Sequence, residues 1–548
     1  MLRLFENRYF ACVLLFLSAL FIYSFNLDHR LYVDEFYHLI PAGSLLSDGS
    51  FSIGNGEYLR ATLYTRFISL VFEVFGESPL VARYSSAVTV SLFIASFYLI
   101  IDYLVGKKEA AVSAIVLMLL PTSIYLAQFV RFYALHQLLF FIGTVAVYFL
   151  VMENVTPKKK VVCALVALCS FGLAHHFQVT TLIGALALGA WVFFVYVFRV
   201  LDAETRSKFN VGVLASLCLL GVSLFILLIM KGKLAGLIAD FRYAAPWSSD
   251  NVNNYQFYHQ LLRYQYPSFW TWFPVICLVS IYLKPKLATL FVTVFLGGIL
   301  LFSLAGMKDE RYIVYLYPFA VVITVIFCVA MLSKLKELLV EILDRIPFLH
   351  EQAGLKRVGT NSILAITILY VVVSNHAFPT SFHLLNGAQY RHEVGDWALS
   401  REAVAPLVKN ADVVLTVNDV ESLFYFGRFD FNFSRFNLGE ASVKYDDNQD
   451  KEFVIDVRTG LPVVSEIRSL DKILGCYRSG VFLGDKRKWY KSGQGLGSDG
   501  VELLAQYGSL VEVDPRSLLV VYVWKNETLL PPVECEQVYS FKESNAQL

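Results

Sequence analysis

Long apolar runs without charge alternate with short polar segments over the first 376 residues of the chain. Runs of this length cross about 30 Å of hydrocarbon as helices, so the pattern predicts membrane spans. The stretch 161–198 is too long for one helix, and we expect two spans that break at the His175–His176 pair. About eleven transmembrane helices are therefore predicted, near 9–27, 84–105, 110–128, 132–152, 161–198 (two), 209–230, 268–283, 287–305, 312–333 and 361–376.

After residue 376 the pattern changes to short β-branched runs separated by polar helical segments. This alternation favours a small α/β domain with a mostly parallel sheet. The chain is thus predicted to be a mostly α polytopic membrane domain, 1–376, followed by a C-terminal α/β domain, 377–548. Candidate strands are 412–417, 453–457, 480–483 and 518–523, and candidate helices are 391–407, 419–427, 465–476 and 500–509.

The distribution of Lys and Arg among the connecting loops predicts the orientation. With the N-terminus inside, the inner loops hold 17 Lys and Arg in 57 residues, and the outer loops hold 11 in 111. This is the asymmetry of the positive-inside rule. The first apolar run is too long for the hydrophobic part of a signal peptide and is interpreted as a retained anchor. We expect a cytoplasmic N-terminus and an exported C-terminal domain.

Composition excludes several classes of protein. Hydrophobic residues make up 56% of the chain and charged residues only 17%, which is not typical of a soluble enzyme. A net charge of +1 gives no basic stripe for nucleic acid, and eight cysteines are too few for a disulfide scaffold. Cys476 and Cys535 are the only cysteines of the exported part. Either a disulfide between them or two separate buried thiols is compatible with the sequence.

The first loop, residues 28–83, is far longer than a connector requires, and long loops often carry function. It contains adjacent carboxylates, Asp34 and Glu35, followed by His38 and a run with helical spacing. Two carboxylates near a bilayer suit a general base or a metal ligand. The alternative is that Asp34 only caps the helix that follows.

Two arginines at predicted outer ends of spans are candidates for binding an anion. Arg131, in QFVRFYAL, lies between two spans with almost no loop, and Arg311 precedes Tyr312 in KDERYIVYLYP. An arginine with tyrosine hydroxyls can hold a phosphate. The alternative is ordinary behaviour at a membrane surface, where arginines snorkel and tyrosines form belts.

Further polar side chains are predicted on the same face. The His175–His176 pair can bind a divalent metal or a phosphate, or can simply form a polar turn. The loop 231–267 is rich in aromatic and amide side chains, which suit a sugar but are also ordinary at interfaces. The candidates for substrate contact are Glu57, Arg60, His175, His176, Trp247 and Tyr255.

Taken in order, these segments resemble the integral-membrane C-type (GT-C) glycosyltransferases that use polyprenyl-phosphate sugars, the superfamily of the protein O-mannosyltransferases and the lipid A aminoarabinose transferase. The matching segments cover roughly residues 10–335. They are the Asp34–Glu35 pair, EYLRATLYTRFISLVFEVFGESPLVARYSSAV with Arg83, LAQFVRFYAL, AHHFQ and ERYIVYLYPF.

The resemblance implies an inverting transfer of a sugar from an undecaprenyl- or dolichyl-type phosphate to a hydroxyl of a glycan, lipid or protein. It implies Asp34 as the base, with Glu35 beside it, and Arg131, Arg311, Tyr312 and Arg83 as candidates for holding the donor phosphate. Some relatives hold a metal, for which Glu57, His175 and His176 are the candidate ligands here, and a divalent metal stays open.

The resemblance implies that the protein lies in a bacterial inner membrane, with its C-terminal domain in the periplasm. The rivals are a polymerase or ligase of polyprenyl-linked glycans, and a non-catalytic lipid flippase. A transporter is disfavoured, because no predicted span carries Lys, Arg, Asp or Glu in its middle.

Overall fold

The computed structural model describes residues 7–244, 251–345, 372–388, 395–435, 453–456, 458–490 and 495–546, with scattered positions between these ranges. Contacts divide the chain into two compact units. The helical unit comprises Met1–Asn26, Ser86–Gln128 and Phe132–Tyr390, and the loop–sheet unit comprises Leu27–Ser85, Phe129–Arg131 and Arg391–Leu548. The boundary expected after residue 376 stays a prediction.

Seven helices of the described chain are long and apolar enough to cross a membrane, and two bent pairs bring the number to as many as nine. A shorter apolar helix, α1 (Arg8–Tyr23), precedes them. The seven are α4 (Pro79–Leu104), α7 (Tyr133–Met152), α8 (Pro157–Phe177), α9 (Thr181–Leu201), α10 (Lys208–Met230), α14 (Pro285–Leu304) and the span Val314–Leu343, which contains most of α15 (Tyr317–Asp344).

Each bent pair changes direction at a proline. The bend is 65° between α5 (Lys107–Leu119) and α6 (Pro121–Ala127), and 110° between α12 (Phe257–Gln265) and α13 (Pro267–Leu283). Proline lacks an N–H and disfavours helix in the residue before it, so it starts a new helix more easily than it continues one. The helical unit also contains two shorter helices, α11 (Lys233–Arg242) and α18 (Ala377–Leu385).

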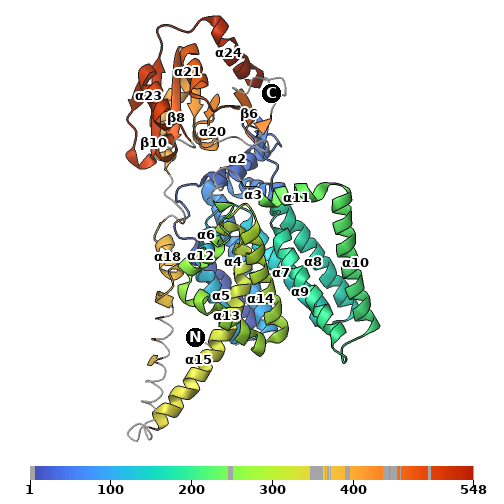
Figure 1. Cartoon of the computed structure of the whole chain (residues 1–548). Coiled ribbons are helices and arrows are strands. Elements are labelled where there is room, and N and C mark those ends of the chain that lie inside the picture. Colours follow the sequence, from blue (N-terminus) through green and yellow to red (C-terminus); the bar gives the residue numbers. More distant parts are fainter. Residues whose placement is uncertain are drawn as a thin grey trace. The chain divides into compact units, whose positions relative to one another are not determined.

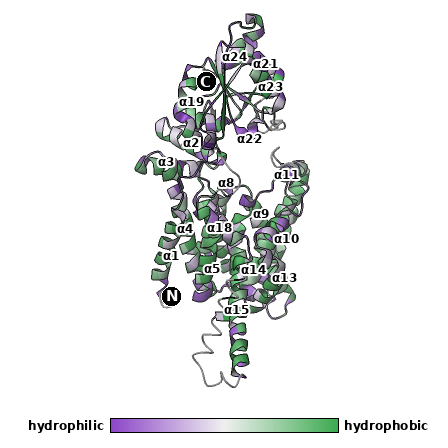
Figure 2. Cartoon of the chain, turned by 90° about the vertical axis from the view of Figure 1, so that its left-hand side faces the viewer, coloured by the Kyte–Doolittle hydropathy of each residue, from purple (hydrophilic) through white to green (hydrophobic). Residues whose placement is uncertain are grey.

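Every predicted span before residue 334 overlaps one of these helices, and Figure 2 shows that they are mainly hydrophobic. The chain is an integral membrane protein. The count of eleven is not confirmed, since the last predicted span, 361–376, lies largely outside the described residues.

The predicted break at the His175–His176 pair is wrong in position. Helix α8 continues through both histidines to Phe177, and α9 begins at Thr181. The chain leaves the helix at Gln178, whose backbone is extended. Histidine is compatible with a last helical turn, where its charged form favours the negative end of the helix dipole. A polar pair therefore did not require a turn.

The first loop forms its own secondary structure within the loop–sheet unit. Helix α2 (Val33–Ser47) is followed by a short hairpin of β1 (Ser52–Ile53) and β2 (Gly56–Glu57), and then by helix α3 (Thr62–Phe75). Figure 1 shows α2 close to α20 (Asp419–Phe426) of the C-terminal domain. Phe36 is buried there against Phe424 and Tyr425, at ring distances of 4.9 and 5.9 Å.

The C-terminal domain has a sheet in the order β5-β6-β7-β4-β3-β8-β10-β9. Its four central strands are parallel, and the pairs at both sides are antiparallel. The sheet is therefore mixed rather than mostly parallel. The strands are β3 (Val413–Thr416), β4 (Phe431–Phe433), β5 (Val443–Lys444), β6 (Phe453–Asp456), β7 (Pro462–Val464), β8 (Ser479–Asp485), β9 (Gly508–Val511) and β10 (Leu519–Lys525).

All four predicted strands are present as β3, β6, β8 and β10, and three predicted helices match α20, α21 (Ile467–Cys476) and α23 (Gly497–Tyr507). The predicted helix 391–407 overlaps α19 (Arg401–Asn410) only from Arg401, and residues 391–394 lie outside the described residues. The structure adds α22 (Lys486–Trp489) and α24 (Pro532–Ala546). Buried apolar side chains from the sheet and helices form two cores, one around Trp489 and one around Trp397.

Of the two alternatives left open for the exported cysteines, the structure contains the disulfide. Cys476, at the end of α21, is bonded to Cys535 in α24 across a sequence separation of 59 residues. Both side chains are buried. The bond therefore ties the last helix of the domain to α21.

We expect the double substitution Cys476→Ser/Cys535→Ser to destabilise the C-terminal domain by about 4 kcal/mol, the loop-entropy value for a ring of this size. The measurement is the urea midpoint at which the domain becomes sensitive to protease in detergent solution. Cys169→Ser, at an exposed free thiol of α8, is the control. A double variant with the midpoint of this control would contradict the prediction.

Candidate active site

The first turn of α2 carries both carboxylates of the first loop. Tyr32 is the N-cap, and Asp34 and Glu35 are the second and third helical residues. Asp34 is therefore not the cap, which removes the simple capping alternative. Acidic side chains are favourable here because the N-terminus of a helix is the positive end of its dipole. Successive residues lie about 100° apart around a helix, so the two carboxylates point in different directions.

Glu35 is completely buried and forms a two-pronged ion pair with Arg83. Arg83 Nε donates to Glu35 Oε1 at 2.9 Å, and Nη2 donates to Oε2 at 2.7 Å. The backbone N–H groups of Tyr32 and Val130 also donate to this carboxylate, at 2.9 and 3.1 Å. Glu35 thus joins the start of α2, the start of α4 and the turn that precedes α7.

The remaining N–H groups of Arg83 are used within the first loop. They donate to the carbonyl oxygens of Leu27 (2.8 Å), His29 and Arg30 (3.1 Å). With the two bonds to Glu35, these contacts occupy all five donors of the guanidinium. The geometry leaves Arg83 no N–H for a donor phosphate, although the sequence made it a candidate for one.

Asp34 has a different environment from Glu35. Its side chain is 23% exposed, and its Oδ1 lies 3.6 Å from Nη2 of Arg131. Arg131 itself is only 4% exposed, in the turn between α6 and α7, and its Nη1 donates to the hydroxyl of Tyr58 at 3.3 Å. The accessible carboxylate and the buried guanidinium of the site therefore face each other across a loose ion pair.

His38 lies one turn after Asp34 on α2 and is buried. Its Nδ1 is 2.9 Å from Oγ1 of Thr65 in α3. Burial, together with the positive charges of Arg131 and Arg60, holds the pKa of this imidazole well below its usual range, against a smaller opposite effect of Asp34. His38 is consequently neutral at physiological pH and adds no positive charge beside Asp34.

Glu57 is the last residue of β2, and Arg60 lies between β2 and α3; both side chains are exposed. The positive charge of Arg60 contributes to the lowered pKa of His38. Among the residues that the structure describes, no group of three or more His, Cys, Asp or Glu is placed to hold a metal ion. The predicted ligands Glu57, His175 and His176 therefore do not form such a group.

The helical unit has a second polar cluster where α14 leads into α15. The ammonium of Lys308 is buried and donates to the carbonyl oxygens of Ala305 (2.6 Å) and Val252 (2.9 Å). Burial and the neighbouring Arg242 lower its pKa. Glu310 accepts from Gln265 Nε2 at 2.9 Å and from the hydroxyl of Tyr317 at 3.2 Å.

Arg311 belongs to this second cluster. Its Nε lies 3.6 Å from Oδ2 of Asp309, and its guanidinium lies 5.4 Å from the ring centre of Tyr312. Both Arg311 and Tyr312 are largely shielded from solvent. The structure thus places the guanidinium of Arg311 over the ring of Tyr312, and the role of both in holding a phosphate stays a prediction.

The other candidates for substrate contact are more exposed or are not described. His175 and His176 are exposed in the last turn of α8. Tyr255 is half exposed, and its ring lies 5.5 Å from the guanidinium of Arg242 and 5.9 Å from Nζ of Lys308. Trp247 lies outside the described residues.

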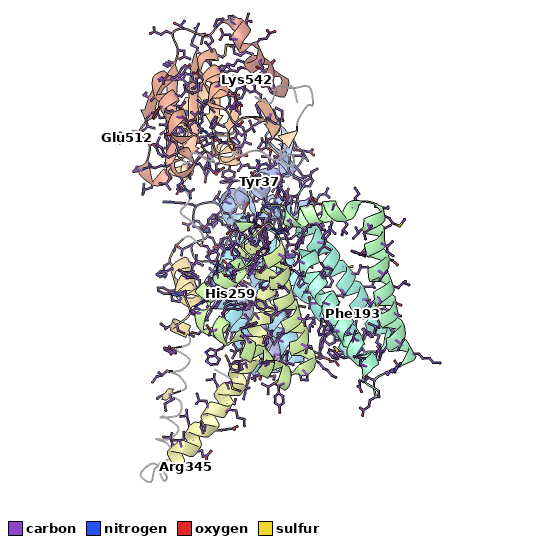
Figure 3. All side chains as sticks on the ribbon, viewed as in Figure 1. Tyr37, Phe193, His259, Arg345, Glu512 and Lys542 are labelled. Atoms are coloured by element: carbon purple, nitrogen blue, oxygen red, sulfur yellow. A yellow bond between two sulfur atoms is a disulfide. The ribbon has the colours of Figure 1, made fainter. Side chains whose placement is uncertain are left out.

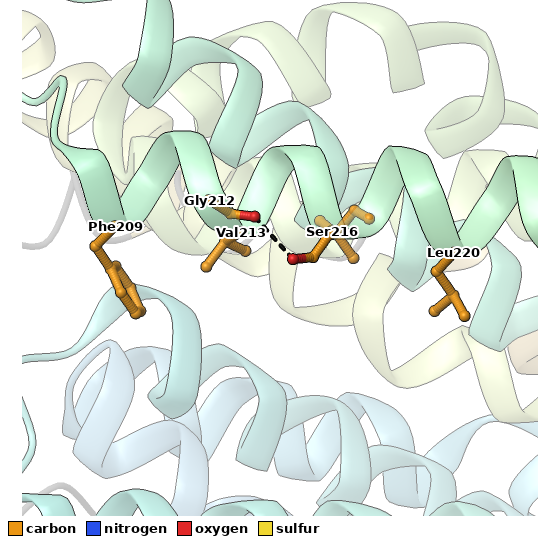
Figure 4. Close-up of a pocket in the computed structure, with 6 residues that line it drawn as sticks. Phe209, Gly212, Val213, Ser216 and Leu220 are labelled. Atoms are coloured by element: carbon orange, nitrogen blue, oxygen red, sulfur yellow. Dashed lines mark hydrogen bonds between the residues drawn. The ribbon is translucent and has the colours of Figure 1, made fainter.

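A shallow apolar pocket lies along α10 of the helical unit (Figure 4). The hydroxyl of Ser216, its one polar side chain, donates to the carbonyl oxygen of Gly212 at 2.8 Å. No titratable group lines it, so it offers no acid, base or phosphate ligand. Its lining residues are Phe209, Gly212, Val213, Ser216, Leu217 and Leu220.

Several residues of the site were not singled out from the sequence, notably Tyr58, Thr65 and Lys308. Tyr58 is adjacent to Glu57 in the EYLRAT segment, but a tyrosine near a membrane surface is too common to be chosen on that ground. Lys308 had a usable signal, because it stands in a short loop between two apolar spans together with Asp309, Glu310 and Arg311.

No protein-family model matches this chain, and no curated protein does. Solved structures do match it. The crystal structure of ArnT from Cupriavidus metallidurans bound to undecaprenyl phosphate matches with a TM-score of 0.58 and 14% identity, over 95% of this chain and 99% of that one. The archaeal oligosaccharyltransferase AglB from Archaeoglobus fulgidus, in complex with an inhibitory peptide and a dolichol-phosphate, matches with a TM-score of 0.54 and 12% identity. This match covers 95% of this chain and 75% of that one.

Both of these proteins are GT-C glycosyltransferases that use polyprenyl-phosphate donors or carriers. The chain therefore has the GT-C fold, as its sequence motifs indicated. At this level of identity the likeness establishes the fold, and the chemistry has to be argued from the side chains.

Proposed function

We propose that this protein is a glycosyltransferase that moves a sugar from a polyprenyl phosphate to a hydroxyl group of a glycan, lipid or protein acceptor. The reaction takes place at the outer face of the membrane and inverts the anomeric centre. The membrane is a bacterial inner membrane, with the N-terminus in the cytoplasm and the C-terminal domain in the periplasm. The GT-C fold and the asymmetry of Lys and Arg among the loops support this assignment.

The observation that carries the proposal is the contrast between the two neighbouring carboxylates. Glu35 is buried and accepts four hydrogen bonds, so it has no capacity to take a proton from an acceptor. Asp34 is accessible and lies 3.6 Å from a nearly buried guanidinium. A general base has to reach its substrate, and a departing phosphate needs a cation nearby. Asp34 and Arg131 supply these two groups side by side.

In the proposed reaction, the carboxylate of Asp34 removes the proton from the acceptor hydroxyl. The oxygen forms its bond to the anomeric carbon, and the bond from that carbon to the phosphate oxygen breaks with both electrons going to the phosphate. Arg131 stabilises the negative charge that develops on the polyprenyl phosphate. Glu35 and Arg83 act as positioning residues that hold α2 and the turn bearing Arg131. Among the described residues no group of three or more His, Cys, Asp or Glu could hold a metal ion, and the proposed reaction uses none.

Other candidates keep supporting roles in the proposal. Arg311, over the ring of Tyr312 in the helical unit, stays a candidate for holding the donor phosphate. Glu57, Arg60, His175, His176, Trp247 and Tyr255 stay candidates for contact with the sugar or the acceptor. The sugar and the acceptor are not specified by these residue types.

The direct test uses the purified full chain in detergent with a short-chain polyprenyl-phosphate sugar. We expect release of the polyprenyl phosphate to depend on the protein and to increase with an acceptor that bears hydroxyl groups. Polymerisation of a lipid-linked glycan would favour the polymerase or ligase. A flippase would move the labelled donor between the leaflets of a vesicle without cleaving it, and that result would refute the transferase.

We expect Arg131→Ala and Arg311→Ala each to raise the Kd for a short-chain polyprenyl phosphate about tenfold or more, because one charge-assisted hydrogen bond contributes about 1.5–3 kcal/mol. Lysine at either position should restore binding only in part, since a point charge cannot reproduce the fork of a guanidinium. Binding is measured by calorimetry. Arg206→Ala, at an exposed arginine between α9 and α10, serves as a comparison. If both alanine variants bound the lipid as the wild type does, these arginines would be ordinary interfacial residues.

A further inference from the structure

The first loop is fixed to the C-terminal domain by contact between backbones. The N–H group of Asn55, in the turn between β1 and β2, and that of Gly56, the first residue of β2, donate to the carbonyl oxygen of Thr459 at 2.8 and 2.9 Å. A side chain at Gly56 would place its Cβ 2.6 Å from the carbonyl oxygen of Arg458, and one at Gly460 would lie 2.4 Å from the carbonyl carbon of Asn55. Both glycines are therefore required, and the hairpin has little freedom to move on the domain.

Arg458 reaches from this contact to helix α2. Its Nη1 donates to the hydroxyl of Tyr37 at 2.6 Å, and its guanidinium carbon lies 5.5 Å from the centre of the Tyr37 ring. Asp456 holds the other side of the guanidinium through bonds from Nε (3.1 Å) and Nη2 (2.6 Å), and Asp419 Oδ2 lies 3.3 Å from Nη2. Figure 3 labels Tyr37 on α2 of this unit.

Tyr37 continues the connection toward the candidate base. Its ring stacks on that of Tyr58 with a centroid distance of 5.2 Å and an angle of 28°. The hydroxyl of Tyr58 accepts a hydrogen bond from Nη1 of Arg131, whose Nη2 lies 3.6 Å from Asp34. Tyr58 also packs edge-on against His38, at 5.5 Å. The contacts form a continuous series, Asp456–Arg458–Tyr37–Tyr58–Arg131–Asp34, all within the loop–sheet unit.

We propose that Arg458 of the C-terminal domain is a positioning residue for the transfer reaction, acting through Tyr37 and Tyr58 to place Arg131 against Asp34. This inference rests on the roles proposed for Asp34 and Arg131. Arg458 does not touch the substrate. It fixes the stacked tyrosine pair, and the hydroxyl of Tyr58 in turn fixes the guanidinium that must meet the leaving phosphate.

The chain offers a matched control for Arg458. Arg516 makes the same local bonds to the aspartate two residues before it, from its backbone N–H, Nε and Nη2 to Asp514 at 2.9, 3.1 and 2.7 Å. Its side chain is 71% exposed, and none of its hydrogen bonds reaches the first loop. Arg516→Met therefore removes the same type of aspartate–arginine pair without the link to Tyr37.

We expect Arg458→Met to lower kcat about tenfold, since a displacement of about 1 Å at a reacting group can cost up to 10²-fold. The acidic limb of the pH–rate profile should also move to higher pH, because a displaced Arg131 no longer favours the ionised base. A loss of folded protein would lower the amplitude of the profile without moving this limb. Arg516→Met should change neither quantity.

A second, milder variant tests the same contact in case Arg458→Met does not fold. Tyr37→Phe removes one oxygen and retains the ring that stacks on Tyr58, so it should move the acidic limb in the same direction. Because both substitutions break the same link, the double variant should be no worse than Arg458→Met alone. Additive losses, or an unmoved limb in both single variants, would overturn the proposal.

A readout that does not depend on activity separates this proposal from the proposed function. Fluorotyrosine placed at position 58 should show a ¹⁹F resonance that shifts in Arg458→Met and stays in place in Arg516→Met. If the wild type cleaved no donor but this resonance shifted in Arg458→Met, the contact from Arg458 to Tyr58 would be supported and the transferase assignment would be refuted. If the wild type were active and neither the resonance nor the pH profile responded, the role of Arg458 would fall.

Discussion

Asp34→Asn is expected to lower the turnover of donor and acceptor by about 10³-fold or more, in the upper part of the range for loss of a general base. Asparagine keeps the volume of the side chain but cannot accept the proton of a hydroxyl at neutral pH. The side chain is partly exposed and its ion pair with Arg131 is loose, so folding should be little affected. The measurement is the rate of sugar transfer at saturating donor, together with the Kd of a short-chain polyprenyl phosphate, which should stay close to that of the wild type.

The control for this variant is Asp48→Asn, at an exposed carboxylate that follows the same helix. It should transfer sugar at the wild-type rate. A loss of only two- or threefold in Asp34→Asn would remove Asp34 from the role of base. Transfer would then need another carboxylate, since Glu35 is fully occupied by its hydrogen bonds.

The second large effect is expected on stability, at the buried ion pair beside the site. Arg83→Met leaves the carboxylate of Glu35 buried without its cation, and breaking such a pair from one side costs about 3–5 kcal/mol. We expect a marked fall in the thermal midpoint and in the yield of monodisperse protein in detergent. Glu35→Gln should be milder, because the amide oxygen still accepts one hydrogen bond.

A double variant distinguishes the buried charge from a simple loss of packing. Glu35→Leu/Arg83→Met removes both charges and should recover part of the stability, though not all, since the N–H groups of Tyr32 and Val130 lose their acceptor. Arg66→Met, at an exposed arginine of α3, is the control. If Arg83→Met had the midpoint of this control, the pair would contribute nothing to stability.

The spans and the main strands were predictable because their causes are local. A charge-free apolar run in a membrane has to be helical to satisfy its backbone, which is why α7, α10 and α14 appear where the sequence indicated. The short β-branched runs at β3 and β8 similarly reflect burial, because these central strands are buried almost throughout. The strands β4 and β7 are only three residues long, too short for any period to be seen.

The sequence predicted some of the residues that belong to the site, but it did not predict which of their side chains contact one another. The sequence brought forward Asp34, Glu35, Arg83 and Arg131, and all four lie together in the loop–sheet unit. It could not tell which carboxylate points inward, because that depends on the rotation of α2 against its neighbours. Nor could it join Arg458 to Tyr37, which is 421 residues away in sequence. Contacts of that separation follow from the fold and leave no local pattern.

The close backbone approach of Gly56 and Gly460 also defines which parts of the chain have to be inherited together. A chimera that received a C-terminal domain from a distant homologue, but kept its own hairpin, would bring two surfaces of independent ancestry to a contact with no space for a methyl group. The exchangeable module is therefore the discontinuous set of residues 27–85, 129–131 and 391–548. Residue 56 and residue 460 should accordingly change in concert when homologous sequences are aligned.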